Sequence, residues 1–359
     1  MLIGTSSLPA GNRLPGKAPD KAPDLPRTHA RRSPRTAGLL LGVALLAAAT
    51  ALSLAVGTQH IPLGQVWSAL LSPSGTEHDA IVRELRLPRT LIGIAVGAAI
   101  GLGGAVMQVL TRNPLADPGL LGVNAGASAA VVTAISVLGI TSFTGYLWFA
   151  LVGAALAATA VHALGGARHA TPVRLALAGT AVNAALFGYV NGLQLGNLDT
   201  LDEMRHWSVG TLAKRDADLL LTVAPLLTAG ALLALALARP LGALALGEDH
   251  ARALGTHVRR TRILAVLAIT LLCGGATALC GPIGFLGLMI PHAARAFCGP
   301  DPRWLLPCCA LYAPVLLLVS DVVGRVLVPP SEIEVGTVTA FVGGLLFIHL
   351  VRRRKAAQL

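Results

Sequence analysis

The chain has 359 residues, of which 54% are hydrophobic and 13% are charged, and its mean hydropathy is +0.70. The charged share is about half of the ~25% found in soluble domains, so the composition excludes an ordinary soluble protein and indicates a membrane protein. The net charge of +11 would suggest nucleic-acid binding in a soluble protein. Because the basic residues lie mainly at the ends of apolar segments, membrane orientation is the favoured role for them.

The N-terminal segment differs from the rest of the chain. Residues 1–36 are rich in Pro, Arg, Lys and Ser and have almost no apolar run, so we expect a disordered cytoplasmic tail there. The apolar stretch 38–57 follows basic residues, which is also the arrangement of a signal peptide. It reaches the ~20 residues needed to cross a bilayer, so we interpret it as the first span of a membrane domain over residues 37–355.

Further apolar segments follow along the chain, and ten spans are expected in total. They lie near 38–56, 89–110, 119–139, 146–165, 174–195, 218–238, 263–281, 282–298, 304–327 and 335–351. The segment 282–298 is short and follows "CGPIG", so a re-entrant segment is the alternative there. Both chain ends are basic, which predicts that both are cytoplasmic and that the number of spans is even.

Glycines recur at intervals of four residues in the second expected span, at Gly93, Gly97 and Gly101, followed by Gly103 and Gly104. Small residues at this spacing allow another helix to approach closely, so we expect them to pack against a neighbouring span. Lining of a translocation path is the alternative.

The five cysteines are Cys273, Cys280, Cys298, Cys308 and Cys309. Their spacing is not that of a metal site, so we expect no bound metal and interpret all five as inert buried thiols.

The fifth expected span carries residues at steps of four, four, four and three: Gly179, Asn183, Phe187, Asn191 and Gln194. This spacing places them on one helical face. A polar face within a membrane span usually points at protein or water. Hydrogen bonding between helices and the lining of a translocation path both remain open.

A short charged segment lies in the cytoplasmic loop expected between spans six and seven. Gly247 can begin a helix, and the acidic Glu248 and Asp249 are favourable at its positive N-terminal end. Gly255 can adopt the left-handed conformation that ends a helix. Two apolar residues three apart give it an apolar edge. The residues are, in order, Gly247, Glu248, Asp249, Ala251, Leu254 and Gly255. Because so short a helix is marginal in water, we expect it to dock against a partner; a solvated turn is the alternative.

Three arginines are expected on the outward side, where the positive-inside rule disfavours them. Arg86 and Arg89 lie in "LRLPR", and Arg325 lies near the outer end of the ninth expected span. Snorkelling to lipid headgroups is one explanation. Asp321 precedes Arg325 by one turn, so we expect an i,i+4 ion pair between them.

Four motifs resemble those of the FecCD-type permeases, the membrane subunits of ATP-driven importers for iron–siderophore complexes, haem and vitamin B12. They are "LRLPRTLIGIAVGAAIGLGGAVMQVLTRNPLADPGLLGVNAGASAAVV" (85–132), "LALAGTAVNAAL" (175–186), "LGEDHARALG" (246–255) and "GPIGFLGLMIPHAARAF" (281–297). The resemblance implies an all-α membrane protein with ten transmembrane helices, the bundle of a type II ABC importer. It also implies a second permease subunit, identical or paralogous, two ATP-binding ABC ATPase subunits and an extracytoplasmic substrate-binding protein.

The resemblance also suggests roles for particular residues. "LGEDHARALG" is similar to the family's coupling loop, which contacts the ATPase, and the outward arginines are similar to those that receive acidic residues of the binding protein. The family's fifth span lines the path, which favours that role for Asn183, Phe187, Asn191 and Gln194. Thr171, Pro172 and Val173 fall where related permeases narrow the path on the cytoplasmic side. Pro172 and Val173 replace the small hydroxyl residues of the vitamin B12 importer, so the gate chemistry stays open.

We therefore expect a permease in the cytoplasmic membrane that carries an iron(III)–siderophore complex, with a haem or cobalamin importer as the alternative. The chain has no GxxxxGK[ST] motif, so we expect no catalytic residues and no cofactor of its own, and ATP to be hydrolysed by partner subunits. An ion-gradient-driven secondary transporter is the alternative from another class. It predicts ionisable residues at the midplane of broken helices, which the spans largely lack apart from Asp321.

Overall fold

The computed structural model describes residues 33–166, 172–213, 215 and 217–356. Every regular element in this part of the chain is a helix, which confirms the all-α prediction. The helices are α1 (Ser33–Ala55), α2 (Leu63–Leu71), α3 (Glu77–Ala80), η1 (Ile81–Arg86), α4 (Leu87–Thr111), η2 (Pro118–Leu121), α5 (Val123–Ser136), α6 (Phe143–Leu164), α7 (Pro172–Gly196), α8 (Leu198–Val209), α9 (Ala217–Ala236), α10 (Ala238–Ala245), α11 (Glu248–Ala253), α12 (Val258–Ile269), η3 (Thr270–Gly274), α13 (Gly275–Cys280), α14 (Leu286–Cys298), α15 (Pro302–Leu327) and α16 (Val335–Ala356).

Ten helical segments coincide with the ten expected spans, but they are not equally long. Among the described residues, seven helices are long and apolar enough to cross a membrane. The other three expected spans correspond to α5 with 14 residues, α14 with 13 residues, and α16, whose apolar part is Val335–Ile348. Multi-pass membrane insertion is therefore supported, while the count of ten spans remains a prediction.

Two expected boundaries fall elsewhere. α1 begins at Ser33, so residues 33–36 of the expected disordered tail are helical, while residues 1–32 lie outside the described residues. α14 begins only at Leu286, because residues 281–284 are not helical and Gly281 has a φ of +77°.

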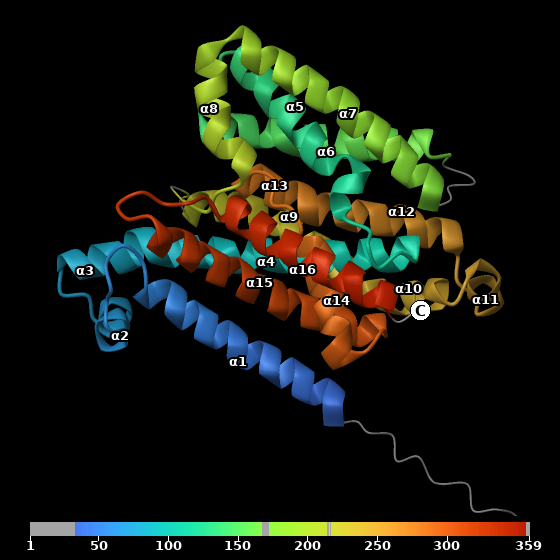
Figure 1. The fold of residues 1–359 in the computed structure, drawn as a ribbon, viewed down its shortest axis with the longest axis horizontal. Helices are drawn as coiled ribbons and strands as arrows, with labels where there is room; N and C mark the ends of the chain where they lie inside the picture. The colour runs from blue at the N-terminus through green and yellow to red at the C-terminus, as the bar shows by residue number, and fades with distance from the viewer. Residues whose placement is uncertain (1–32, 167–171, 214, 216, 357–359) are drawn as a thin grey trace, which may run out of the picture. The chain divides into compact units, whose positions relative to one another are not determined.

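α4 is the central helix of the bundle and packs against α15, α14, α9 and α12 (Figure 1). Its glycines make the contact with α15 close. A methyl group built at Gly97 would lie 2.6 Å from the Cα atom of Pro314, and one at Gly101 would lie 2.6 Å from the carbonyl oxygen of Cys309. A methyl group at Gly104 would lie still closer, 2.0 Å from the carbonyl oxygen of Gly287 on α14. These glycines are buried, so the prediction of close packing is confirmed and the path-lining alternative is not supported.

Replacing Gly97 with valine is expected to separate α4 from α15. The added carbons would meet backbone atoms of Pro314, which cannot turn aside as a flexible side chain could. Overpacking of this kind costs about 1–3 kcal/mol or more, so the midpoint of thermal unfolding, followed by size-exclusion chromatography in detergent, should fall. Gly344→Val on α16 is the matched control, because a methyl group there meets nothing within 4 Å. Equal midpoints for the two variants would contradict this account of the packing.

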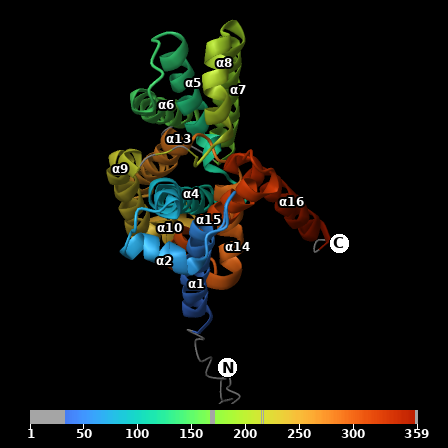
Figure 2. The same cartoon turned by 90° about the vertical axis from the view of Figure 1, so that its left-hand side faces the viewer.

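The two ends of the bundle carry different short elements (Figures 1 and 2). One end, which we call the α3 end, carries α2, α3, η1 and the segment 328–334 between α15 and α16. The opposite end, the α11 end, carries α10 and α11. Neither α2 nor α8 was predicted from the sequence.

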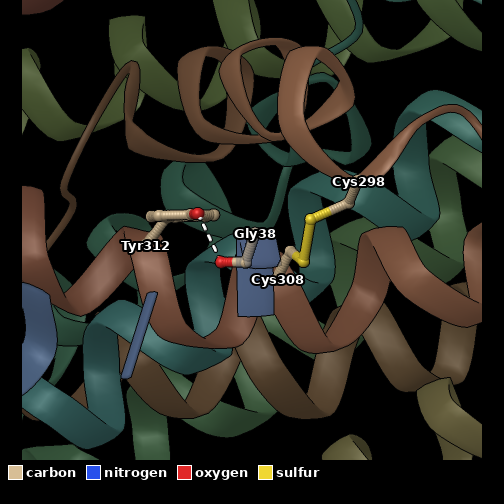
Figure 3. Close-up of a disulfide and its surroundings, with 4 residues drawn as sticks. All are labelled: Gly38, Cys298, Cys308 and Tyr312. Carbon is tan, nitrogen blue, oxygen red and sulfur yellow. Dashed lines mark hydrogen bonds between the residues drawn. A yellow bond between two sulfur atoms is a disulfide. The ribbon is translucent and has the colours of Figure 1, made fainter. Parts of the chain in front are cut away.

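A disulfide joins Cys298, the last residue of α14, to Cys308 in α15 (Figure 3). The prediction of five free thiols is therefore wrong for these two, whereas Cys273, Cys280 and Cys309 are buried free thiols. The chain folds back at residues 299–301, which brings two helix segments ten residues apart in sequence into contact. Beside the disulfide, the hydroxyl of Tyr312 donates to the carbonyl of Gly38 at 2.7 Å and links α15 to α1.

Candidate functional site

The short charged segment forms helix α11, as expected. Gly247 is its N-cap with a φ of +113°, and Gly255 has a φ of +76°, the left-handed conformation that glycine adopts without strain. The backbone N–H of Gly255 donates to the carbonyl of Arg252 at 3.0 Å, and that of Thr256 donates to the carbonyl of Ala251 at 2.9 Å. Both capping predictions are confirmed, and the helix ends through these two bonds.

The acidic residues of α11 make ion pairs within the helix and with α12, and none of these pairs was predicted. Arg252 lies 3.0 Å from Glu248 and 3.0 Å from Asp249 within the helix. Glu248 also pairs with Arg262 of α12, fourteen residues away. Burial raises the pKa of Glu248, but the hydrogen bond and charge of Arg262, with the charge of Arg252, outweigh it and hold the pKa below its ordinary value. Glu248 therefore fixes α11 to α12.

Ala251 and Leu254, which were expected to form one apolar edge, lie in different surroundings. Ala251 is fully buried against the chain, whereas Leu254 is 65% exposed, as is Leu246 at 66%. Three residues advance a helix by about 300°, so the two side chains point about 60° apart. α11 thus anchors itself through Ala251 and presents exposed leucines on a charged loop.

The residues expected to line a path on α7 do not share one environment. Gly179 packs against the backbone of Leu120, and the amide of Asn183 donates to the carbonyl of Gly119 at 3.0 Å. Phe187 is 54% exposed, and Asn191 is exposed. A helix has about 3.6 residues per turn, so each four-residue step turns about 40° beyond a full turn. The stripe therefore winds from the inner face to the outer face of α7.

The remaining residues of this region are placed as follows. Gln194 is half-buried. Thr171 lies outside the described residues, Pro172 is the first residue of α7, and Val173 is 68% exposed. Tyr189, which the sequence analysis missed, is 45% exposed and shares a 2.8 Å hydrogen bond with Thr133 of α5.

Cysteine labelling should separate the two ends of the α7 stripe. In a background in which the five native cysteines are replaced, Asn191→Cys should react with a membrane-impermeant thiol reagent in at least one transport state, because this position is exposed. Asn183→Cys should stay protected, because its position faces η2. Labelling is measured in vesicles with and without ATP, and equal reaction at both positions would contradict this division of the helix.

Two of the three arginines that were expected on the outward side, Arg86 and Arg325, are buried in the protein. Arg86 is 6% exposed and donates to the carbonyls of Leu54, at 2.8 Å, and Gln59. Arg325 is 3% exposed and donates to the carbonyl and hydroxyl of Ser53, at 3.2 and 3.1 Å. Cations at the end of a helix stabilise its last carbonyls. Both side chains therefore help to cap the C-terminus of α1, and neither snorkels away from the protein.

Arg89 lies closer to the surface and binds two carboxylates. Its Nε and Nη2 atoms donate to Asp321, the shortest distance being 2.8 Å, and its Nη1 atom donates to Glu332 at 2.7 Å. Asp321 also lies 3.2 Å from Arg325, which confirms the expected i,i+4 pair. The Arg89–Asp321 pair spans 232 residues and was not predicted.

A cavity of about 380 Å³ at the α3 end joins these groups. Its charged lining residues are Glu84, Arg86, Arg89, Arg215, Arg325 and Glu332. Arg215, which also stacks on the Phe143 ring at 4.1 Å, was missed, although it is basic in a loop expected to face outward, the same signal that singled out Arg86. The Nε atoms of Arg215 and Arg325 are buried without a hydrogen-bond partner. The arrangement suits anionic groups arriving from outside the chain.

A polar contact links two central helices near the α11 end. The Arg295 Nη1 atom of α14 donates to Gln108 Oε1 of α4 at 2.7 Å, and Gln108 Nε2 donates to the carbonyl of Leu288 at 2.9 Å.

Within the described part of the chain, no group of three or more His, Cys, Asp or Glu side chains could hold a metal ion.

Comparison with known proteins covers almost the whole membrane domain. Residues 45–353 match the model of the FecCD transport family. The chain is 49% identical over 320 residues to the ferric enterobactin transport system permease protein FepD of Escherichia coli K12, covering 88% of this chain and 94% of FepD. It is 38% identical to the hemin transport system permease protein HmuU of Yersinia pestis, covering 76% of this chain and 83% of HmuU.

A solved structure described as an inward-facing metal-chelate type ABC transporter matches with a TM-score of 0.78 and 28% identity. The match covers 89% of this chain and 99% of that one. The family model and the relatives agree with the fold and with the motifs found in the sequence. This chain belongs to the FecCD transport family.

Proposed function

We propose that this chain is the permease subunit of an ATP-driven importer that carries an iron(III)–siderophore complex across the cytoplasmic membrane. The observation that carries the proposal is the 49% identity to a ferric enterobactin permease over 88% of the chain. Identities to the citrate permease FecD and the hemin permease HmuU are lower, at 36% and 38%. Ferric enterobactin is therefore the first substrate to test, ahead of ferric citrate, haem and cobalamin.

The proposed assembly contains a second permease subunit, identical or paralogous, and two ATPase subunits that use ATP. α11 is the proposed coupling element toward an ATPase, supported by its capped geometry and its exposed leucines. With this role the α11 end lies on the cytoplasmic side, and we propose that both chain ends are cytoplasmic, as the positive-inside rule predicts. The chain itself binds no cofactor in this scheme.

The α3 end is the proposed docking surface for the extracytoplasmic substrate-binding protein. Arg89 is the proposed direct contact, since its Nη1 atom faces the partly exposed Glu332. Arg86 and Arg325 line the same cavity and would add to its positive potential, while their guanidinium groups cap α1. The proposed path follows the outer face of α7, with Phe187 and Asn191 along it, Asn183 and Gln194 nearer its wall, and the segment 171–173 at the cytoplasmic gate.

Radiolabelled iron uptake tests this function. The chain is reconstituted in proteoliposomes with its second permease, ATPase and binding protein, and ⁵⁵Fe-enterobactin, ⁵⁵Fe-citrate, ⁵⁵Fe-hemin and ⁵⁷Co-cobalamin are supplied separately. We expect accumulation of ferric enterobactin that requires ATP and the binding protein and persists when ion gradients are collapsed. Uptake driven by an ion gradient without ATP would support a secondary transporter, and preferential uptake of hemin or cobalamin would reassign the substrate.

A further inference from the structure

Glu332 lies in the segment between α15 and α16, at the mouth of the arginine-lined cavity. Its carboxylate is 2.7 Å from the Nη1 atom of Arg89, and the two side chains are 34% and 15% exposed, respectively. The next residue is held in place, because the N–H of Ile333 donates to the carbonyl of Gly324 at 3.0 Å. The backbone therefore keeps the Glu332 side chain beside Arg89, while its long side chain can still turn toward solvent.

The guanidinium of Arg89 donates hydrogen bonds to two carboxylates that differ in exposure. Asp321 is 1% exposed and takes the Nε and Nη2 side of the fork. This two-point contact fixes the plane of the guanidinium, as paired Arg–carboxylate bonds do. The remaining Nη1 atom points to Glu332, so Asp321 acts as the positioning residue and Glu332 occupies the accessible position.

The charges of this cluster do not cancel. Three arginines, Arg86, Arg89 and Arg325, face two carboxylates, Asp321 and Glu332, which leaves one excess positive charge. Turning Glu332 away would leave two. A carboxylate brought by another protein would restore the balance in the same place.

We propose that Glu332 occupies, within this chain, the position on Arg89 that a carboxylate of the substrate-binding protein takes on docking, and that docking displaces it. This inference rests on the proposed docking surface. Glu332 then acts as an internal competitor: it keeps Arg89 paired when the binding protein is absent and lowers the affinity for that protein.

The experiment uses the permease assembled with its partner subunits in nanodiscs. The probe is the substrate-binding protein of the same importer, loaded with ferric enterobactin. The dissociation constant and association rate are measured at low and high salt for the wild type, Glu332→Gln and Glu332→Ala. Glu84→Gln is the matched control, because it removes the same charge from the same cavity while Glu332 stays on Arg89.

Both Glu332 variants should lower the dissociation constant about two- to fivefold at low salt, the size of effect that an exposed ion pair produces. Glu84→Gln should have a smaller effect, and high salt should reduce all the differences, because exposed charges are screened. In an Arg89→Gln background, Glu332→Gln should lose its advantage over Glu84→Gln, as a double-mutant cycle requires for a direct pair.

The outcomes separate this inference from the docking proposal. Equal shifts for Glu332→Gln and Glu84→Gln, or weaker binding by the Glu332 variants, would overturn the inference while leaving the docking surface intact. If Arg89→Gln, shown by size-exclusion chromatography to assemble normally, binds the loaded protein like the wild type, Arg89 is not a docking residue and both proposals fail.

Discussion

Replacing Gly255 with valine is expected to lower ATP-driven uptake roughly tenfold, because a β-branched residue at a φ of +76° adds about 1–3 kcal/mol of backbone strain. The six-residue α11 has no stability of its own to absorb this strain. A methyl group at Gly255 meets nothing within 4 Å, so the effect comes from the backbone and not from crowding. The closing bonds from Gly255 and Thr256 should be lost first.

The measurement compares ⁵⁵Fe-enterobactin uptake with ATP hydrolysis in the same proteoliposomes. Basal hydrolysis by the partner ATPases should persist, while its stimulation by the loaded binding protein should fall with uptake. Gly255→Asn is the matched control, since asparagine tolerates the left-handed conformation far better than valine does, and it should retain most of the activity. Full uptake by the valine variant would show that α11 is not the coupling element.

Local features of the molecule were predictable from the sequence because their causes are local. The two glycines around α11 occupy backbone conformations that the sequence alone suggested, and the four-residue glycine spacing of α4 does bury a helix contact. α8 is polar and gives no apolar pattern, so only its helix start is visible in the sequence. Its N-cap, Asn197, accepts from the N–H groups of Asp199 and Thr200, a capping pattern that a search for helix starts would find.

The partners of distant residues could not be predicted in the same way. Their place on the expected outward side, where basic residues are disfavoured, singled out Arg86 and Arg89, but not the α1 carbonyls or the Asp321 carboxylate that they bind. These contacts depend on how α1, α4 and α15 pack against one another. That packing could not be inferred from the residue pattern of a single sequence. The Cys298–Cys308 bond has the same origin, in a turn between two helices.

The α7 stripe shows a different limit. Two residues four apart lie on nearly the same helical face, but each such step turns the side-chain direction by about 40°. Over several steps the stripe therefore leaves that face. Asn183 and Asn191 therefore lie in different surroundings, although the pattern grouped them. The positions of η2, α5, α6 and α8 beside α7 decide which part of the stripe is covered.

Replacing Asp321 with asparagine is expected to destabilise the protein severely. Its carboxylate is 1% exposed and lies between Arg89, at 2.8 Å, and Arg325, at 3.2 Å. Removing one partner of a buried ion pair costs about 3–5 kcal/mol, because the remaining charge is left without compensation. Here the buried Arg325 guanidinium would lose its carboxylate and Arg89 would keep only Glu332, so monodisperse protein in detergent should nearly disappear and the unfolding midpoint of any remainder should fall.

Glu332→Gln provides the matched control for this change, because it removes the other carboxylate of the same arginine. Exposed pairs contribute only about 0–1 kcal/mol, so this variant should unfold near the wild-type temperature. Arg325→Met in the Asp321→Asn background removes the cation that is left without a carboxylate and should restore part of the yield, although the bonds to Ser53 are lost. If Asp321→Asn unfolds at the same temperature as Glu332→Gln, the buried carboxylate does not hold α4 and α15 together, and Arg89 must take its orientation from other contacts.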